Sequence, residues 1–454
     1  MQRTGSLEVT ENGVALEVSP SMTPQFTYTA RPNGVGVGMA EDPDEMAVLG
    51  SLATSPGAVT LWGVHTTGRH SLGCPVPGIS RPESHSLGAD WCIAGGHFPD
   101  PAVHFHGLRV DVTNLTEWAW QPSLTELRVV GERRMTWQFD PPASLDDQLS
   151  NGEGYLALKP ALNWSGPTIR GIDVNSYSEL EVELFDGWTL TNCLTKVATP
   201  VASLMTLLSG ATCEVRSLSV WSEEFDWSSV HGHNVVSSAP KTGAKLLLHR
   251  TDVEHGFLVR WLDLCEKISP VPQILSAVVG GQLPTVEAEA LALATTIEAL
   301  HRTLNPGARR FSDDDIRLSI DKLSASDLPQ EVRDSLASAL GTWWPEYSYP
   351  MRVRALAEPV AKAVPDCVGK LTRWKNAVVD QRVSLAHGLG SRMGRDQILR
   401  MHSLNRSIQW TLMLRLLLEA GVDPEKLRGA TDSSEMFERD RDEWYRHWPK
   451  VFAS

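Results

Sequence analysis

The sequence predicts a two-part α+β protein, in which a mostly antiparallel, sandwich-like β domain precedes an all-α helical bundle. Short apolar or alternating segments, separated by Gly, Pro, Asn and Asp, dominate residues 1–280 and are typical of antiparallel sheets. A segment rich in Pro and Gly, SPVPQILSAVVGGQLP (269–284), ends this pattern. Beyond it, apolar residues recur at helical spacing. We therefore expect a β-rich domain over residues 1–270 and an all-α domain over residues 283–454.

The first part contains several segments with strand character. Leu180, Val182 and Leu184 alternate with glutamates, which predicts a strand with one buried face. The glycine-rich segment NGVGVGMA (33–40) predicts a turn or a strand, since no helix follows that could receive a phosphate. The predicted strands are AVTLWGVHT (58–66), AVHFHGLRVDV (102–112), LTELRVV (124–130), MTWQFD (135–140), ELEVELF (179–185), CEVRSLSVW (213–221) and AKLLLH (244–249), and a helix, HGFLVRWLDLCEKI (255–268), closes the region.

The second part predicts five or six helices. Thr285 and Ser312 are N-cap candidates, and three aspartates follow Ser312 in the first turn, where they suit the helix dipole. Pro329 and Gly341 suit the two ends of another helix. The predicted helices span residues 285–304, 312–325, 329–341, 351–364 with an interruption at Pro359, 366–388, and 395–422.

Charge and composition exclude several classes of protein. The net charge of −14 argues against a protein that coats nucleic acid over its whole surface. The charge is uneven, because residues 1–282 hold 17 Lys and Arg against 31 Asp and Glu, whereas residues 351–415 hold 12 against 4. This basic segment predicts either an anion-binding face or solvated helix faces. No membrane span or signal peptide is expected, and the six scattered cysteines favour free thiols in the cytoplasm.

One pair of residues suggests chemistry. The segment DQRVSLAHGLG (380–390) places Arg382 and His387 five positions apart at the end of a predicted helix. In a straight helix, positions i and i+5 lie about 140° apart, so the two side chains converge only if the helix ends or bends between them. The pair is either a surface arginine with a helix-terminal histidine, or part of a site. His104 and His106 lack further ligands at metal-site spacing, so no metal site is expected.

The R-x4-H pair late in an all-α bundle resembles the motif of the HEPN (higher eukaryotes and prokaryotes nucleotide-binding) superfamily. The closer likeness is to the ApeA family of phage-defence proteins, which join a β-rich N-terminal domain to a C-terminal HEPN domain. The stretches that carry the likeness are TTIEALHRTL (295–304), VVDQRVSLAHG (378–388) and LNRSIQWTLMLRLLLEAGV (404–422), with AVTLWGVHTTG, VHFHGLRV and residues 255–282 in the first part. Many HEPN nucleases have a polar residue after the motif arginine, where this chain has Val383.

The resemblance implies a bacterial, cytoplasmic endoribonuclease, a toxin-like hydrolase of antiviral defence by abortive infection. It would act without metal or cofactor, leaving 2′,3′-cyclic phosphate and 5′-OH ends. Its implied partners are RNA, with tRNA as a candidate, a second copy in a homodimer or dimer of dimers that forms a composite site, and a phage-derived trigger sensed by the first domain. The implied catalytic residues are Arg382 and His387, the supporting residues are Glu298, His301, Arg302, Asp380 and Ser384, and the RNA contacts are Lys370, Arg373 and Lys375.

Two other interpretations stay open. A catalytically silent HEPN module would bind nucleotides or proteins as a scaffold, and Val383 favours this interpretation. Alternatively, the sixteen tryptophans would mark a carbohydrate-binding β domain fused to a helical oligomeriser. Substitution of His387 separates the nuclease from the scaffold, and glycan binding without nucleic-acid affinity would indicate the third interpretation.

Overall fold

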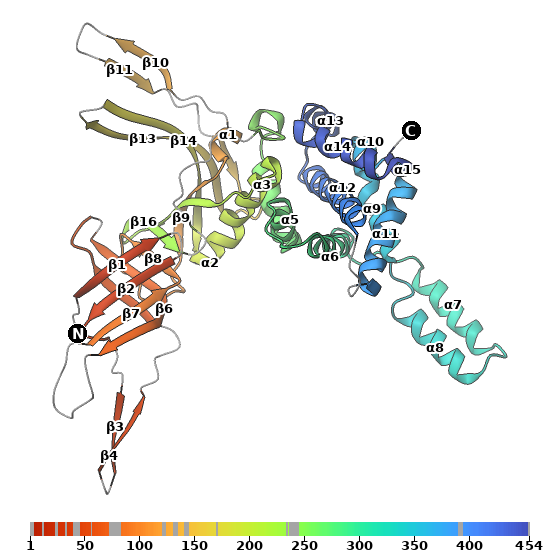
Figure 1. Cartoon of the computed structure of the whole chain (residues 1–454), viewed down its shortest axis with the longest axis horizontal. Coiled ribbons are helices and arrows are strands. Elements are labelled where there is room, and N and C mark those ends of the chain that lie inside the picture. The colour runs from red at the N-terminus through yellow and green to blue at the C-terminus, as the bar shows by residue number, and fades with distance from the viewer. Residues whose placement is uncertain are drawn as a thin grey trace. The chain divides into compact units, whose positions relative to one another are not determined.

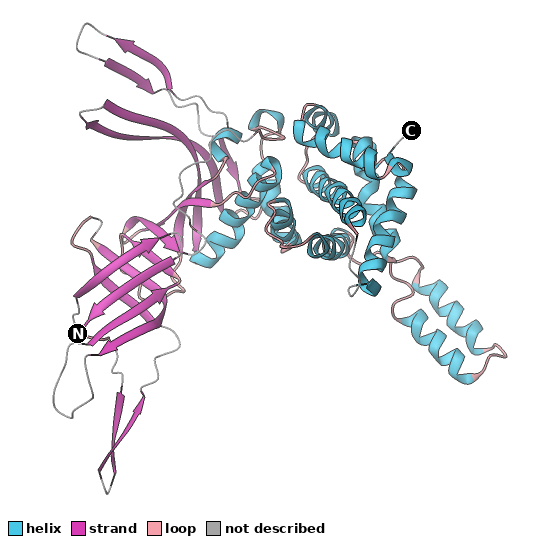
Figure 2. Ribbon diagram, viewed as in Figure 1, coloured by secondary structure: helices cyan, strands magenta, loops and turns pink. Residues whose placement is uncertain are grey.

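The structure is a computed structural model that describes residues 4–10, 13–22, 26–31, 34–39, 46–55, 57–71, 83–119, 124–129, 135–139, 145–168, 171–232, 235, 245–388 and 394–452. The chain divides into two compact units. The β unit comprises Met1–Met205 and Cys213–Ala244, and the helical unit comprises Thr206–Thr212 and Lys245–Ser454. All strands that the structure describes lie in the β unit (Figure 2), which confirms the predicted two-part α+β class. The predicted domains ended at residue 270 and began at residue 283, whereas this division falls after residue 244.

The described strands of the β unit are all antiparallel to their neighbours (Figure 1). Most of them join one continuous sheet in the order β1-β2-β7-β6-β8-β16-β15-β9-β14-β13-β12, with β5 paired to β6, while β3-β4 and β10-β11 form separate hairpins. The strands are β1 Thr4–Thr10, β2 Gly13–Ser19, β3 Phe26–Arg31, β4 Gly34–Met39, β5 Met46–Ser51, β6 Ala58–Ser71, β7 Glu83–Ala89, β8 Trp91–Ala94, β9 Phe105–Val112, β10 Leu124–Val129, β11 Met135–Phe139, β12 Leu145–Gln148, β13 Gly154–Thr168, β14 Gly171–Trp188, β15 Val215–Ser222 and β16 Asp226–Gly232.

Helical segments within the β unit were not predicted. They are α1 (Leu115–Ala119), α2 (Leu190–Cys193), the π-helical turn Leu194–Ala198 and α3 (Thr199–Ser209). The segment from Leu190 to Leu208 is largely buried, but its more exposed polar residues, Thr191, Thr195 and Thr199, recur every four positions, a helical signal that was overlooked. The predicted strand over residues 244–249 is wrong. Lys245–His249 forms no strand, because Leu247 bonds to the carbonyl of Leu208 and Leu248 is buried.

Charged residues pair across the neighbouring strands β15, β9, β14 and β13 of the sheet. Glu181 on β14 is buried and is bonded by both Arg109 and Lys159, each at 2.6 Å. Asp111, two residues after Arg109 on β9, is 6% exposed and lies 3.5 Å from a guanidinium nitrogen of Arg216. Burial raises the pKa of Asp111 to about 6, although Arg216 opposes the shift. The folded β unit therefore binds a proton at Asp111 more tightly than the unfolded chain does.

We expect Asp111→Asn to remove a pH-dependent loss of stability. Because the pKa of Asp111 is raised in the folded state, its contribution to stability is full below the unfolded pKa and is lost as the pH rises through about 6. The asparagine variant should thus gain on the order of 2 kcal/mol relative to wild type between pH 4 and pH 7. Urea unfolding across this range measures the difference. Asp146→Asn, an exposed change on β12, is the control; a difference that stays constant with pH would contradict the prediction.

The helical unit consists of helices that pack around one long central helix (Figure 1). The central helix α12 contacts α5, α6, α9, α10, α11 and α14. Its residues from Met401 to Leu417 are mostly buried, so this helix is core in the single chain. The helices are α4 Phe257–Ile268, α5 Val271–Val279, α6 Val286–Leu304, α7 Asp313–Ser324, α8 Gln330–Gly341, α9 Tyr349–Ala363, α10 Pro365–Val368, α11 Leu371–Gly388, α12 Arg395–Glu419, α13 Pro424–Asp432, α14 Glu435–His447 and α15 Pro449–Phe452, with a 3-10 turn at Arg250–Asp252.

The structure confirms several predicted helix ends and corrects others. Thr285 and Ser312 cap α6 and α7 with their side chains. Pro359 does not interrupt α9, which continues through it. The predicted helix over residues 366–388 is two helices, because Gly369 adopts a left-handed φ of 59° between them. The expected five or six helices are exceeded, since the described residues after 282 form α6 to α15.

The described cysteines, Cys92, Cys193, Cys213, Cys265 and Cys367, are buried and form no disulfide with one another, and Cys74 lies outside the described residues. Burial raises the pKa of the Cys92 thiol to about 11. Among the described helices, none combines the length and apolar character that crossing a membrane requires.

Candidate active site

Arg382 lies where three helices meet. It projects from α11, and its Nη2 donates a hydrogen bond of 2.9 Å to Oε1 of Glu298 on α6. Its Cζ lies 4.4 Å from the ring centroid of Tyr349, the first residue of α9. The side chain of Arg382 is 44% exposed, so the ion pair and the aromatic face hold it while part of the guanidinium still meets solvent. This arrangement presents an oriented cation at the surface of the helical unit.

Buried contacts on the other side of α11 set its rotation. The preceding residue, Gln381, donates a 2.7 Å hydrogen bond to Asn405 on α12. Asn405 is fully buried and donates in turn to the carbonyl of Val286 on α6. An apolar cluster of Ala290, Leu385 and Met401 lies beside this network. These contacts fix α11 against α6 and α12, and they thereby set the rotation of α11 that points Arg382 toward Glu298.

Tyr349 supplies a neutral ring at this site. It is 9% exposed, and its hydroxyl has no hydrogen-bond partner among the described residues. Burial raises the pKa of Tyr349 above its usual range, with Glu298 adding to the shift and Arg382 opposing it. The phenol therefore remains protonated at neutral pH, and its face is available to the guanidinium.

His387 lies in the last turn of α11, and its side chain is outside those that the structure describes. The helix runs without a break from Arg382 to Gly388. The two motif positions therefore lie about 140° apart around the helix axis. No end or bend of the helix occurs between them to bring them together within one copy of the chain.

The other supporting residues predicted on α6 have separate partners. His301 is 2% exposed and packs against Tyr347, with ring centroids 5.3 Å apart. Burial lowers the pKa of His301, and Arg352 and Arg415 lower it further, which keeps the ring neutral. Arg302 is exposed and pairs with Glu346 at 3.3 Å. Glu298 and Arg302 share a face of α6, because they are four positions apart.

Asp380 and Ser384 lie on α11, two positions before and after Arg382, and are exposed. Residues two positions apart do not face one another on a helix. Within the described part of the helical unit, neither side chain has a hydrogen bond to Arg382. The structure therefore does not bring these two residues together with the motif arginine.

The predicted RNA contacts lie toward the start of α11. Lys370 immediately precedes the helix and is exposed, and its amide bonds to the carbonyl of Val451. Arg373 donates to the carbonyl of Lys450 at 2.8 Å, which ties it to the end of the chain. Lys375 lies seven positions, or two turns, before Arg382 and shares its face of the helix. Of the three, Lys375 is best placed to extend the surface around Arg382.

Two features near the motif were missed. The predicted helix began at residue 351, whereas α9 begins at Tyr349, so Tyr349 fell outside it. Arg352 was not considered, yet it lies one turn after Tyr349 and pairs with Glu346 at 2.9 Å. The signal that could have revealed them is the segment YSYPMR, in which a serine precedes a proline at a helix start.

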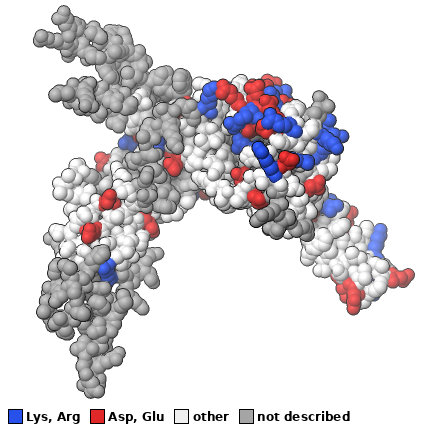
Figure 3. Space-filling model, in the orientation of Figure 1, with Lys and Arg blue, Asp and Glu red and all other residues white. Residues whose placement is uncertain are grey.

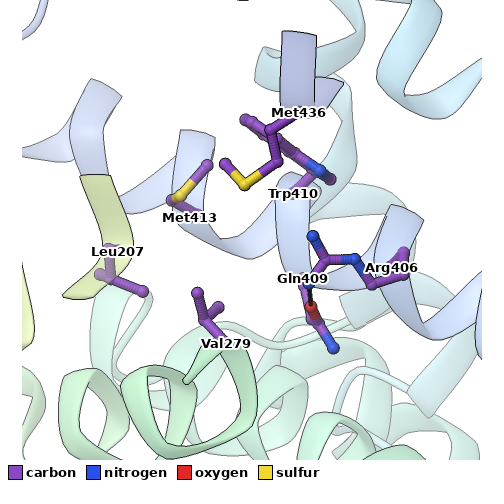
Figure 4. Close-up of a pocket in the computed structure, with 7 residues that line it drawn as sticks. All are labelled: Leu207, Val279, Arg406, Gln409, Trp410, Met413 and Met436. Carbon is purple, nitrogen blue, oxygen red and sulfur yellow. Dashed lines mark hydrogen bonds between the residues drawn. The ribbon is translucent and has the colours of Figure 1, made fainter. Parts of the chain in front are cut away.

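A small pocket in the helical unit does not form a ligand site. It is enclosed by apolar side chains beside Arg406 and Gln409, which are bonded to each other at 2.7 Å (Figure 4). Its volume of about 10 Å³ holds at most a single water molecule. Among the described residues, no group of three or more His, Cys, Asp or Glu side chains is arranged to hold a metal ion.

Comparison with known proteins gives one match. Residues 4–242, more than half of the chain, match the family model described as ApeA N-terminal domain 1. No curated protein and no solved structure matches the chain.

Proposed function

Because the chain belongs to the family of the ApeA N-terminal domain 1, we propose that its helical unit is a HEPN-type endoribonuclease of anti-phage defence. The family supplies the defence context. The HEPN assignment and the chemistry rest on the R-x4-H motif at Arg382 and His387. In this proposal the β unit senses a phage-derived trigger, and cleavage of host or phage RNA aborts the infection.

The observation that carries the proposal is the position of Arg382. A guanidinium that is held by Glu298 and Tyr349, yet 44% exposed, retains donors for an incoming phosphate. Arginine matches the oxygens of a phosphate with two parallel hydrogen bonds and stays charged at every physiological pH.

The reaction uses the nucleophile that RNA itself carries. The 2′-OH attacks the adjacent phosphorus, the bond to the 5′-oxygen breaks, and the products are a 2′,3′-cyclic phosphate and a 5′-OH. His387 exchanges the protons as general base or acid, since an imidazole titrates near neutral pH. Arg382 stabilises the negative charge that accumulates on the phosphorane. The 2′-OH needs no metal to become a nucleophile.

We propose a composite site formed by two copies of the chain. Arg382 and His387 occupy positions about 140° apart on one continuous helix, so one copy does not direct both toward one phosphate. Val383, directly after the motif arginine, is 49% exposed, and Ile398 and Leu399 in the first turn of α12 are 39% and 38% exposed. Exposed apolar side chains of this kind are available to an interface. A two-fold dimer would bring two motifs into one cleft, and dimers of dimers would retain it.

The test is incubation of the purified full chain with total bacterial RNA in EDTA, followed by mapping of the fragment ends. The proposal expects cleavage that leaves cyclic phosphates and that phage-infected lysate stimulates. Fragments with 3′-OH ends, or cleavage only after added metal, would contradict it. If the purified chain cleaves no RNA, either alone or with infected lysate, the proposed nuclease activity is refuted.

Glu298→Gln should slow cleavage by on the order of 10-fold, because the carboxylate that positions Arg382 is lost and small displacements of a catalytic group are costly. The free energy of unfolding should change by less than about 1 kcal/mol, since both partners of this ion pair are partly exposed. Rate measurements beside urea unfolding separate the two effects. Glu287→Gln, on the same helix, is the control and should cleave at the wild-type rate. Equal rates for Glu298→Gln and wild type would show that Glu298 does not contribute to the site.

A catalytically silent scaffold is the second candidate, and Val383 is the feature that favours it. This apolar side chain is 49% exposed directly after the motif arginine. A scaffold would keep its protection against phage after Arg382→Ala or His387→Ala, provided that the variants fold. A nuclease would lose protection with either change.

A further inference from the structure

A polar pocket of about 210 Å³ lies beside the proposed active site, within the helical unit. It is formed by the end of α6, the base of the α7–α8 hairpin and the start of α9. The base of the hairpin is closed by a 2.7 Å bond from the Arg310 amide to the Pro345 carbonyl. On α6, the pocket residues His301 and Arg302 follow Glu298, the partner of Arg382, by about one helical turn. The pocket therefore lies one to two turns along α6 from the ion pair between Arg382 and Glu298. Its polar lining includes His301, Arg302, Asn305, Arg309, Glu346 and Arg352.

Positive charge exceeds negative charge in the pocket lining. Arg302 and Arg352 both pair with the same oxygen of Glu346, at 3.3 and 2.9 Å. The Arg352 side chain is only 7% exposed, and its Nη1 has no hydrogen-bond partner among the described residues. Arg309 adds a third guanidinium, paired with Asp313. A buried charged donor without a partner is costly, so an anion with several acceptor oxygens would stabilise this arrangement.

His301 contributes a neutral polar group to the same pocket. Its Nε2 is buried and has no partner in the described part of the chain. Burial and the neighbouring Arg352 lower the pKa of His301. The ring is therefore suited to a hydrogen bond with a sugar hydroxyl rather than to a second ion pair.

Aromatic side chains are exposed next to the pocket. Trp343 and Trp344 directly follow the pocket residue Thr342 and are 64% and 41% exposed, with ring centroids 5.6 Å apart. The guanidinium of Arg310 lies 5.6 Å from the Trp344 ring and 5.0 Å from the Phe311 ring. Unlike charged regions elsewhere in the helical unit, much of the visible hairpin surface is uncharged (Figure 3). Exposed aromatic rings beside arginines are the surface on which unpaired bases stack.

We propose that this pocket binds a nucleotide of single-stranded RNA next to the cleavage site. Its phosphate contacts Arg302, Arg309 and Arg352, and its base stacks on Trp343 and Trp344. The identification of the ligand as RNA rests on the proposed function. The α7–α8 hairpin thus extends the substrate surface away from Arg382 and selects unpaired RNA, since a base within a duplex cannot reach the tryptophans.

The test measures binding of a short fluorescent single-stranded RNA by anisotropy, with the full chain carrying His387→Ala so that the RNA stays intact. Trp343→Ala combined with Trp344→Ala should weaken binding by about 10- to 100-fold with little change in its salt dependence. Arg302→Gln combined with Arg309→Gln should flatten the slope of log affinity against log salt by up to about 0.7, the value for one phosphate that is no longer neutralised. Leu318→Ala, an exposed apolar change elsewhere on α7, should leave affinity within about twofold of the parent.

An abasic strand of the same length and a duplex should both bind more weakly than the single strand. Equal affinity for the strand with and without bases, or unchanged affinity in the tryptophan variant, would refute the stacking site. A fall in molecular mass in the tryptophan and Leu318 variants, without loss of RNA affinity, would show instead that the hairpin docks a second copy. RNA that binds through these residues but is never cut by the wild-type chain would refute the nuclease while supporting this binding site.

Discussion

Replacement of His387 by alanine should lower the rate of RNA cleavage by about 10²–10⁴-fold, the range that a positioned general acid or base contributes. His387 lies in the last turn of α11, two residues after the buried Leu385. A variant whose urea unfolding matches wild type shows that the loss is one of chemistry rather than of folding. Single-turnover cleavage with variant in excess over labelled RNA measures the chemical step.

His402→Ala is the matched control, because His402 is an exposed histidine on a helix of the same unit. It should cleave at the parental rate. Arg382→Lys is the second comparison, since lysine keeps the charge but loses the planar fork, and it should fall between wild type and Arg382→Ala. If His387→Ala cleaves as fast as His402→Ala, the R-x4-H pair is not catalytic.

Mixing the two single variants tests the composite site. If one copy supplies Arg382 and the other supplies His387, a mixture of Arg382→Ala and His387→Ala chains should recover part of the activity that each lacks alone. Recovery is expected because the mixed dimer contains one complete set of groups in a shared cleft. A mixture as inactive as its components would indicate that each copy acts alone.

Local sequence signals predicted the helical elements well where one residue decides the structure. Thr285 and Ser312 cap their helices because a hydroxyl is the partner that the first amides lack. The failures involve tertiary context. Pro359 is tolerated inside α9, and Gly369 breaks a continuous pattern because its backbone meets the carbonyl of Val451, where a side chain would be only 2.7 Å away. The helices between Leu190 and Leu208 were overlooked for a different reason, since Thr191, Thr195 and Thr199 recur at helical spacing within a region otherwise read as strands.

The sequence predicted only part of the candidate site, because contacts between distant helices leave no local signal. Glu298 was predicted as a supporting residue, and the structure places it 2.9 Å from Arg382. Asp380 was predicted as another supporting residue, yet its position two residues before Arg382 turns it to a different face of α11. Tyr349 is distant in sequence from both partners and joins them only through the packing of α9 on α6 and α11. No pairing between distant helices can be read from one sequence alone.

The largest loss of stability is expected for Asp440→Ala in the helical unit. Asp440 is 6% exposed on α14, and its Oδ2 accepts bonds from Arg406 Nε at 3.0 Å, Arg406 Nη2 at 2.7 Å and Trp410 Nε1 at 2.9 Å on α12. Removal of the carboxylate leaves a guanidinium that is 18% exposed with Gln409 as its remaining side-chain partner. Breaking a buried pair from one side costs about 3–5 kcal/mol. Urea unfolding followed by the helical circular dichroism signal measures it.

Two further variants show whether the unpaired charge causes this loss. Arg446→Ala on the same helix removes a guanidinium whose ion pair with Glu443 is largely exposed, and it should cost less than about 0.5 kcal/mol. The double variant Arg406→Met with Asp440→Leu removes both buried charges and should recover much of the stability, because apolar pairs often replace buried ion pairs without net cost. If the double variant is as unstable as Asp440→Ala, then shape rather than charge holds α12 against α14. That result would make the junction a packing contact, and the carboxylate would only fill space between Arg406 and Trp410.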